Sequence, residues 1–129
     1  MKLTVLDVLN KDDVVIALIG ATNDSKKYGN IIYKDLKRKN ITVYGINPKA
    51  TTIDGDKAYP TLESLPLRPD ILNFVVPPKI AFTMIQEAVA NGYDNFWLQP
   101  GAESEEILDY LDRSGKTYLA NACVMVETR

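Results

Sequence analysis

Nearly every residue is apolar in five short runs of this 129-residue chain: 14–19, 41–46, 71–76, 95–98 and 117–120. A strand with one face in water alternates apolar and polar residues, whereas a strand covered on both faces is apolar throughout. The runs therefore predict the buried strands of a parallel sheet.

Segments with helical spacing lie between these runs. The clearest has Pro77 and Pro78 in its first turn, ends at 91–92, and has one apolar side: Ile80, Met84, Ile85, Ala88 and Val89. Further helices are expected at 29–39, from the N-cap Ser104 to Gly115, and within residues 1–12, the last docking through Val5, Leu6 and Leu9.

This alternation of strands and helices predicts a single α/β domain over residues 1–129. We expect a Rossmann-like, doubly wound sheet of five to six mainly parallel strands, with helices on both faces. Two segments fit the repeat less well. Residues 47–69 are expected to hold only short structure, with one helical turn near 61–64, and the tail "ACVMVETR" fits a last strand or an irregular edge.

Composition excludes several classes of function. A formal charge of −2 without a block of Lys or Arg argues against nucleic acid. The longest apolar runs are far too short to cross a membrane, and one cysteine without a secretory leader favours the cytoplasm. The absence of histidine removes the usual general base and zinc ligand, so we assign no catalytic residue and no metal site.

The loop after the first run is the first candidate binding site, because ligands of open α/β sheets bind at the carboxyl ends of the strands. Gly20 allows a tight turn there, and Gly29 allows a close approach where the next helix begins. Short donors and positive charges lie between them: Thr22, Asn23, Ser25, Lys26 and Lys27. The loop has the residue types of a phosphate site.

A nicotinamide dinucleotide is a poor ligand for this loop. Thr22 replaces the second glycine of the G-x-G-x-x-G pattern, and Asn47 and Pro48 occupy the place of the acidic residue that would bind the ribose. Lys49 follows them, near the position of a nucleotide's ribose and phosphate.

Six short stretches, in order, resemble a known family. They are the glycine turn after the first run, "NPK", "GDKAYPTLESLP", "VVPP", "WLQPG" and "NACVMVE". Between about Asp13 and Arg129 the chain resembles the small stand-alone CoA-binding proteins, which are similar to the CoA-binding N-terminal domain of the succinyl-CoA synthetase α subunit.

The resemblance implies a coenzyme A (CoA) molecule lying across the strand ends. It implies a first phosphate-holding turn of Gly20, Ala21, Thr22, Asn23 and Ser25, with Lys26 and Tyr28 at its edge. Contacts to the nucleotide half would come from Asn47, Pro48 and Lys49, and the adenine would be flanked by Val76 and Pro77. The residues beneath the pantetheine arm would be Leu98, Gln99, Pro100, Asn121 and Cys123.

The chain departs from the family at two points. The synthetase acts through a phosphorylated histidine in a second domain, and this chain has no histidine, so it cannot perform that reaction alone. "NAC" also stands where many relatives have "DRC", so a neutral amide replaces an aspartate. The leading hypothesis is a module that binds CoA or an acyl-CoA without catalysis. The alternatives are an enzyme that acts on CoA thioesters or thiols through Cys123, and a regulatory module that senses another adenine nucleotide. A homodimer or a protein partner stays open.

Overall fold

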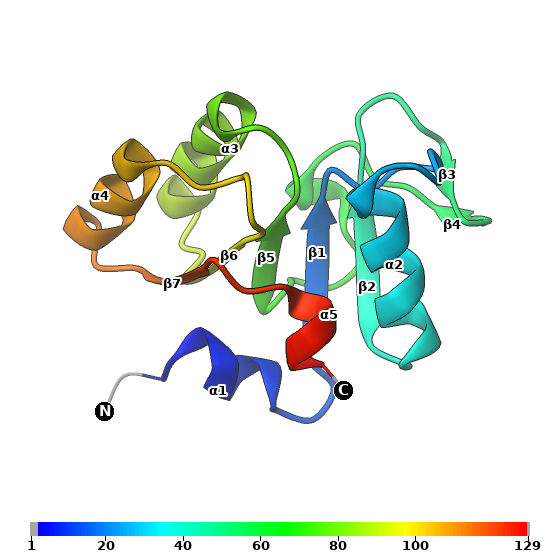
Figure 1. Ribbon diagram of the computed structural model, residues 1–129, viewed down its shortest axis with the longest axis horizontal. Coiled ribbons are helices and arrows are strands. Elements are labelled where there is room, and N and C mark those ends of the chain that lie inside the picture. Colours follow the sequence, from blue (N-terminus) through cyan, green and yellow to red (C-terminus); the bar gives the residue numbers. More distant parts are fainter. Residues whose placement is uncertain (1–2, 129) are drawn as a thin grey trace.

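The five apolar runs form one parallel sheet in the computed structural model, which describes residues 3–128 (Figure 1). Met1, Lys2 and Arg129, which the expected domain includes, lie outside the described residues. The sheet order is β2-β1-β5-β6-β7, and each neighbouring pair is parallel. The strands are β1 (Val15–Ile19), β2 (Thr42–Ile46), β5 (Ile71–Phe74), β6 (Asn95–Leu98) and β7 (Thr117–Ala120).

The winding of the sheet reverses between β1 and β5. From β1 the chain moves outward to β2, then returns across β1 to β5 and continues through β6 to β7. One face of the sheet is covered by α1 (Val5–Leu9), α2 (Tyr28–Arg38) and α5 (Val124–Glu127), and the other by α3 (Pro78–Ala90) and α4 (Glu105–Arg113). The predicted α/β, Rossmann-like, doubly wound fold is confirmed.

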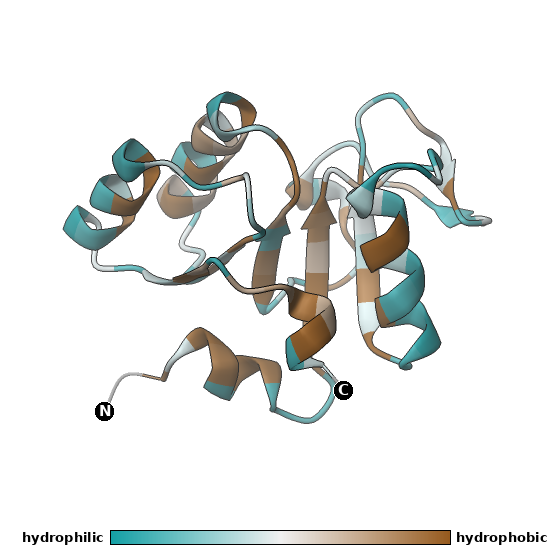
Figure 2. Ribbon diagram, viewed as in Figure 1, coloured by the Kyte–Doolittle hydropathy of each residue, from teal (hydrophilic) through white to brown (hydrophobic). Residues whose placement is uncertain are grey.

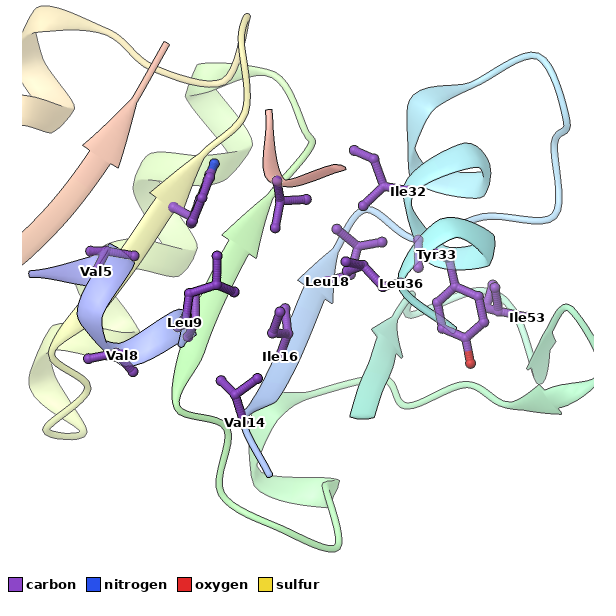
Figure 3. Close-up of a cluster of buried hydrophobic side chains, with 14 of the residues drawn as sticks. Val5, Val8, Leu9, Val14, Ile16, Leu18, Ile32, Tyr33, Leu36 and Ile53 are labelled. Carbon is purple, nitrogen blue, oxygen red and sulfur yellow. The ribbon is translucent and has the colours of Figure 1, made fainter. Parts of the chain in front are cut away.

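Each strand contributes side chains to two cores. Ile16 and Leu18 of β1 pack with Ile32 and Leu36 of α2 in one core (Figure 3). Ala17 and Ile19 of the same strand face α3 and α4 in the other. Apolar residues accordingly fill the strands and the inner sides of the helices, and polar residues the outer turns (Figure 2). No helix in residues 3–128 is long and apolar enough to span a bilayer.

Two helices bury a side that only partly matches the expected one: Val5 and Leu9 of α1, and Ile85 and Ala88 of α3, are buried as expected. On α1, Val8 is buried and Leu6 is exposed; on α3, Ala81 is buried and Ile80 is half exposed. In α3 the buried residues are Ala81, Ile85 and Ala88, so the buried stripe is displaced from the expected one and brings alanines against the sheet. A small residue permits close packing there, which a count of apolar residues does not reveal.

The tail prediction was wrong: residues 124–127 form the short helix α5, neither a strand nor an irregular edge. The backbone N–H of Val124 donates to the side-chain oxygen of Gln99, and Lys39 Nζ donates to the carbonyl of Met125. These long-range contacts favour a helical turn in an apolar run that is too short to have a readable period.

The connection from β2 to β5 contains a hairpin that we did not predict. The hairpin pairs β3 (Thr52–Ile53) with β4 (Asp56–Lys57) around Asp54 and Gly55, which both have positive φ. An Asp-Gly pair with these angles is typical of a tight hairpin turn. The expected helical turn is the 3-10 helix η1 (Leu62–Ser64).

Candidate functional site

Two adjoining hollows lie where the winding reverses, at the carboxyl ends of the strands. The larger, which we call the groove, has a volume of about 500 Å³ and is lined by Gly20, residues 26–29, 75–78 and 100–102. The smaller, which we call the side pocket, has a volume of about 150 Å³ and is lined by Tyr28, Val75, Gln99, Pro100 and Cys123. Tyr28, Val75 and Pro100 line both, so the two hollows form one continuous candidate site.

Glycine is required at two points of the first loop, residues 20–27. Gly20 has φ +106°, and a Cβ there would lie 2.8 Å from the carbonyl oxygen of Val75. A Cβ on Gly29 would overlap the carbonyl oxygen of Gly20. The start of α2 can therefore approach the end of β1 closely only with glycine at these positions.

Three asparagine side chains fix the shape of this loop. Asn47 Nδ2 donates to the carbonyl of Ala21 and Asn30 Nδ2 to that of Thr22, both at 3.0 Å. Asn23 reaches the hairpin: its Nδ2 donates to the carbonyl of Thr52 at 2.7 Å, and its Oδ1 accepts from the N–H of Asp54 at 2.9 Å. The loop carbonyls at 21 and 22 are thereby occupied within the protein.

Several backbone N–H groups of the same region have no acceptor. Among the described residues, no hydrogen bond is made by the backbone N–H of Thr22, Asn23, Ser25, Tyr28 or Gly29. These groups surround the first turn of α2, where the helix dipole is positive, and Lys26 and Lys27 line the groove beside them. Free donors at a helix N-terminus with lysines nearby make a site for an anion such as phosphate.

An ion-pair network ties the hairpin to α2. Lys37 Nζ lies 2.9 Å from a carboxylate oxygen of Asp56 and 3.2 Å from one of Asp54, and the Tyr33 hydroxyl donates to Asp56. Lys37 and then Tyr33 hold the pKa of Asp56 below its ordinary value, while burial, followed by the carboxylate of Asp56, raises the pKa of Tyr33. The network holds the hairpin in place, and the hairpin holds Asn23.

Two residues of β6 and its loop anchor the chain around Cys123. Trp97 is fully buried, and its Nε1 donates to the carbonyl of Ala122 at 2.8 Å. Gln99 Oε1 accepts from the N–H of Val124 at 3.0 Å. Cys123 is held between these bonds as a half-buried free thiol beside the side pocket.

The structure brings many of the expected site residues together. Those that line the groove are Gly20, Lys26, Tyr28, Val76, Pro77 and Pro100; those that line the side pocket are Tyr28, Gln99, Pro100 and Cys123. Outside both hollows lie Ala21, Thr22, Asn23, Ser25, Asn47, Pro48, Lys49, Leu98 and Asn121. The side chains of Ala21 and Leu98 are fully buried in the cores, and Lys49 is exposed beyond β2.

Other site residues escaped the sequence prediction. Four further residues line the hollows: Val75, Pro78, Gly101 and Ala102. Each lies within two positions of an assigned residue, so extending every strand-end loop by one or two positions would have found them. Asn30, which supports the first loop, gave a weaker signal, because the sequence shows it only as one polar residue in an expected helix. The structure shows that its side chain is buried, with 4% exposed. Among the described residues, no group of three or more Cys, Asp or Glu side chains could hold a metal ion.

Comparison with known families now gives this geometry a context. The model of the CoA binding domain matches residues 14–129. This chain belongs to that family. A conserved hypothetical protein of Pyrococcus furiosus has the same fold, with 46% identity, a TM-score of 0.84, and coverage of 88% of this chain and 98% of that chain.

Two curated relatives are larger proteins. The chain is 28% identical to acetate–CoA ligase (ADP-forming) I of Archaeoglobus fulgidus over 88% of its own length, and 28% identical to the α subunit of acetate–CoA ligase (ADP-forming) II of Pyrococcus furiosus over 84%. It spans only 18% and 26% of these relatives. The resemblance to CoA-binding proteins is confirmed, and this CoA binding domain corresponds to a part of each ligase.

Proposed function

We propose that this chain binds CoA or an acyl-CoA across the carboxyl ends of its strands. The observation that carries the proposal is the pair of backbone N–H groups of Tyr28 and Gly29, which lie in the lining of the groove and have no acceptor among the described residues. The chain also belongs to the CoA binding domain family. An anionic ligand would supply these acceptors and benefit from the α2 dipole.

The ligand would lie along both hollows. Its diphosphate would occupy the groove beside the first loop with Lys26 and Lys27, and its adenine would rest against Val76 and Pro77. The pantetheine arm would then extend past Pro100 toward the side pocket. A groove of about 500 Å³ has the volume usual for small-molecule and cofactor sites. Lys49 is exposed after β2, and we propose that it meets a phosphate of the nucleotide half.

A thermal-shift and urea-unfolding panel tests the proposal with CoA, dephospho-CoA, acetyl-CoA, NAD, AMP and ATP. At a hundredfold excess over its dissociation constant, CoA is expected to stabilise the chain by about 2.7 kcal/mol. Unchanged stability with saturating CoA would contradict the proposal. A larger shift with NAD, AMP or ATP would favour a sensor of another nucleotide.

Lysine variants locate the phosphates. Lys26→Ala and Lys49→Ala are each expected to weaken CoA binding by about 1.5–3 kcal/mol, because a charged hydrogen bond is lost. Lys34→Ala is the matched control, since Lys34 is an exposed lysine of α2 outside both hollows. Calorimetric titration measures the three affinities. If Lys49→Ala behaves like the control, Lys49 makes no phosphate contact.

The proposal includes no catalytic step. Turnover of acetyl-CoA by the wild-type chain that is lost in Cys123→Ser would replace it with an enzymatic function.

A further inference from the structure

The side pocket differs in chemistry from the groove that it adjoins. Among the residues that the structure describes, no charged side chain lines it, whereas Lys26 and Lys27 line the groove. Its walls are formed by Tyr28, Val75, Pro100 and Cys123, together with the amide of Gln99. Burying a charge in such surroundings is costly, so the phosphates belong in the groove and the side pocket suits an uncharged end of a ligand.

The Gln99 amide leaves one donor group for a ligand. Gln99 is 4% exposed, and its Oε1 accepts from the N–H of Val124 at 3.0 Å and from Asn73 Nδ2 at 3.5 Å. Because Oε1 accepts both of these hydrogen bonds, the end of the amide that is left for a ligand is Nε2. It has no acceptor among the described residues. Nε2 is not among the buried side-chain atoms that lack a partner, so it is accessible from the side pocket, where a ligand carbonyl oxygen would accept from it in place of water.

We infer that the side pocket binds the acyl group of a short, uncharged acyl thioester of CoA, with Gln99 Nε2 donating to the thioester carbonyl. The inference rests on the proposed function. The volume limits the acyl group: an apolar cavity of about 150 Å³ holds a molecule the size of benzene, and the side pocket has that volume. Acyl groups of two to four carbons fit, whereas an octanoyl group does not. A terminal carboxylate, as in a succinyl group, meets no cation among the described residues that line the pocket.

Titration calorimetry on the full chain tests the size and charge limits with CoA and with acetyl-, propionyl-, butyryl-, octanoyl- and succinyl-CoA. Affinity is expected to rise about fourfold for each added carbon up to butyryl, from the burial of one methylene, and to fall at octanoyl. Succinyl-CoA has the same number of acyl carbons as butyryl-CoA and is expected to bind at least about tenfold more weakly because its carboxylate is desolvated.

The outcomes separate the two proposals. Equal affinities for CoA and all its thioesters would overturn the acyl pocket and leave CoA binding standing. Tight binding of octanoyl- or succinyl-CoA would also overturn it. Failure of every CoA compound to bind would overturn both.

The role of Gln99 has its own test. Acetyl-CoA is compared with S-ethyl-CoA, a thioether of the same size without the carbonyl. The wild-type chain is expected to prefer acetyl-CoA about two- to tenfold, the effect of one hydrogen bond, and Gln99→Met to lose this preference. Gln99→Glu keeps an acceptor for the N–H of Val124 and replaces Gln99→Met in this test if that variant does not fold. Cys123→Leu tests the size of the pocket: its larger side chain fills the space, so the affinities for acetyl-, propionyl- and butyryl-CoA should become nearly equal. A preference for acetyl-CoA that persists in Gln99→Met would overturn the assignment.

Discussion

Two hollows of almost equal volume lie at opposite ends of the sheet. The groove at the carboxyl ends measures about 500 Å³, and a second hollow at the amino ends, lined by residues 9–14, 39–42, Glu127 and Thr128, measures about 510 Å³. We call the second one the amino-end hollow. Volume alone would therefore not identify the binding site.

The two hollows differ in the ends of the helices that meet there. The groove lies at the N-termini of α2 and α3, whereas the amino-end hollow contains the C-caps of α1, α2 and α5: Asn10, Lys39 and Thr128. Helix C-termini present carbonyl groups and a negative dipole end. The charged side chains that line that hollow are Asp12, Asp13, Glu127, Lys11 and Lys39, and both lysines are already paired with aspartates, Lys11 with Asp70 and Lys39 with Asp35. In a parallel α/β domain, the direction of the backbone decides which of two equal hollows suits an anion.

The largest expected effect on stability comes from adding a methyl group to Gly29, at the groove. Gly29→Ala should destabilise the chain by about 3 kcal/mol, since the new Cβ meets the Gly20 carbonyl and the first loop must move. The stabilisation by CoA should vanish with it. Urea unfolding with and without CoA measures both. Asn40→Gly is the counterpart in the amino-end hollow, at φ +61°, and should change stability by less than about 1 kcal/mol. Unchanged CoA affinity in Gly29→Ala would show that the first loop does not hold the ligand.

A smaller effect is expected from Asn47→Asp. The variant keeps an oxygen to accept from the N–H groups of Lys49 and Ala50, but loses the amide that donates to the Ala21 carbonyl. We expect a loss of about 1–3 kcal/mol of unfolding free energy, together with weaker CoA binding. Asn10→Asp is the control at the other end of the sheet, where the Asn10 amide donates to Leu6 on the surface. Equal losses in the two variants would show that Asn47 has no special role in the first loop.

The smallest effect concerns the hairpin network and pH. Lys37 and Tyr33 lower the pKa of Asp56 in the folded chain, so the contribution of Asp56 to stability is complete above its unfolded pKa of about 4. This contribution is lost as the pH falls from about 4 through the lower pKa that Asp56 has in the folded chain. Because the side chains of Asp56 and Lys37 are both nearly half exposed, water screens the pair and Asp56→Asn should cost only about 0.5 kcal/mol at pH 7.

Unfolding at pH 7 and pH 3 checks this expectation against Asp12→Asn, since Asp12 makes no hydrogen bond or ion pair with a described residue. The difference between wild type and Asp56→Asn should shrink at pH 3. A difference that does not change with pH would rule out titration of Asp56 as its source.

The sequence predicted those features that depend on residues close together in the chain. Apolar runs identified the five strands, and the ends of these strands located the loops around the groove. Features that depend on distant contacts were missed. Asn23 was read as a donor to phosphate, but its side chain is bonded to Thr52 and Asp54, about thirty residues away. The helical turn of α5 likewise depends on Gln99 and Lys39. The hairpin is a different case, because the Asp-Gly pair at 54–55 is a local hairpin signal that the sequence contains and that we did not use.

Trp97 is the single tryptophan of the chain, and it is bonded to the carbonyl of Ala122, next to Cys123. Displacement of residues 122–124 would break this bond and admit water to the indole, which shifts its fluorescence to longer wavelength. The domain thus carries an intrinsic optical probe of the segment beside the side pocket, and ligand-induced movement there could be followed in real time without a label.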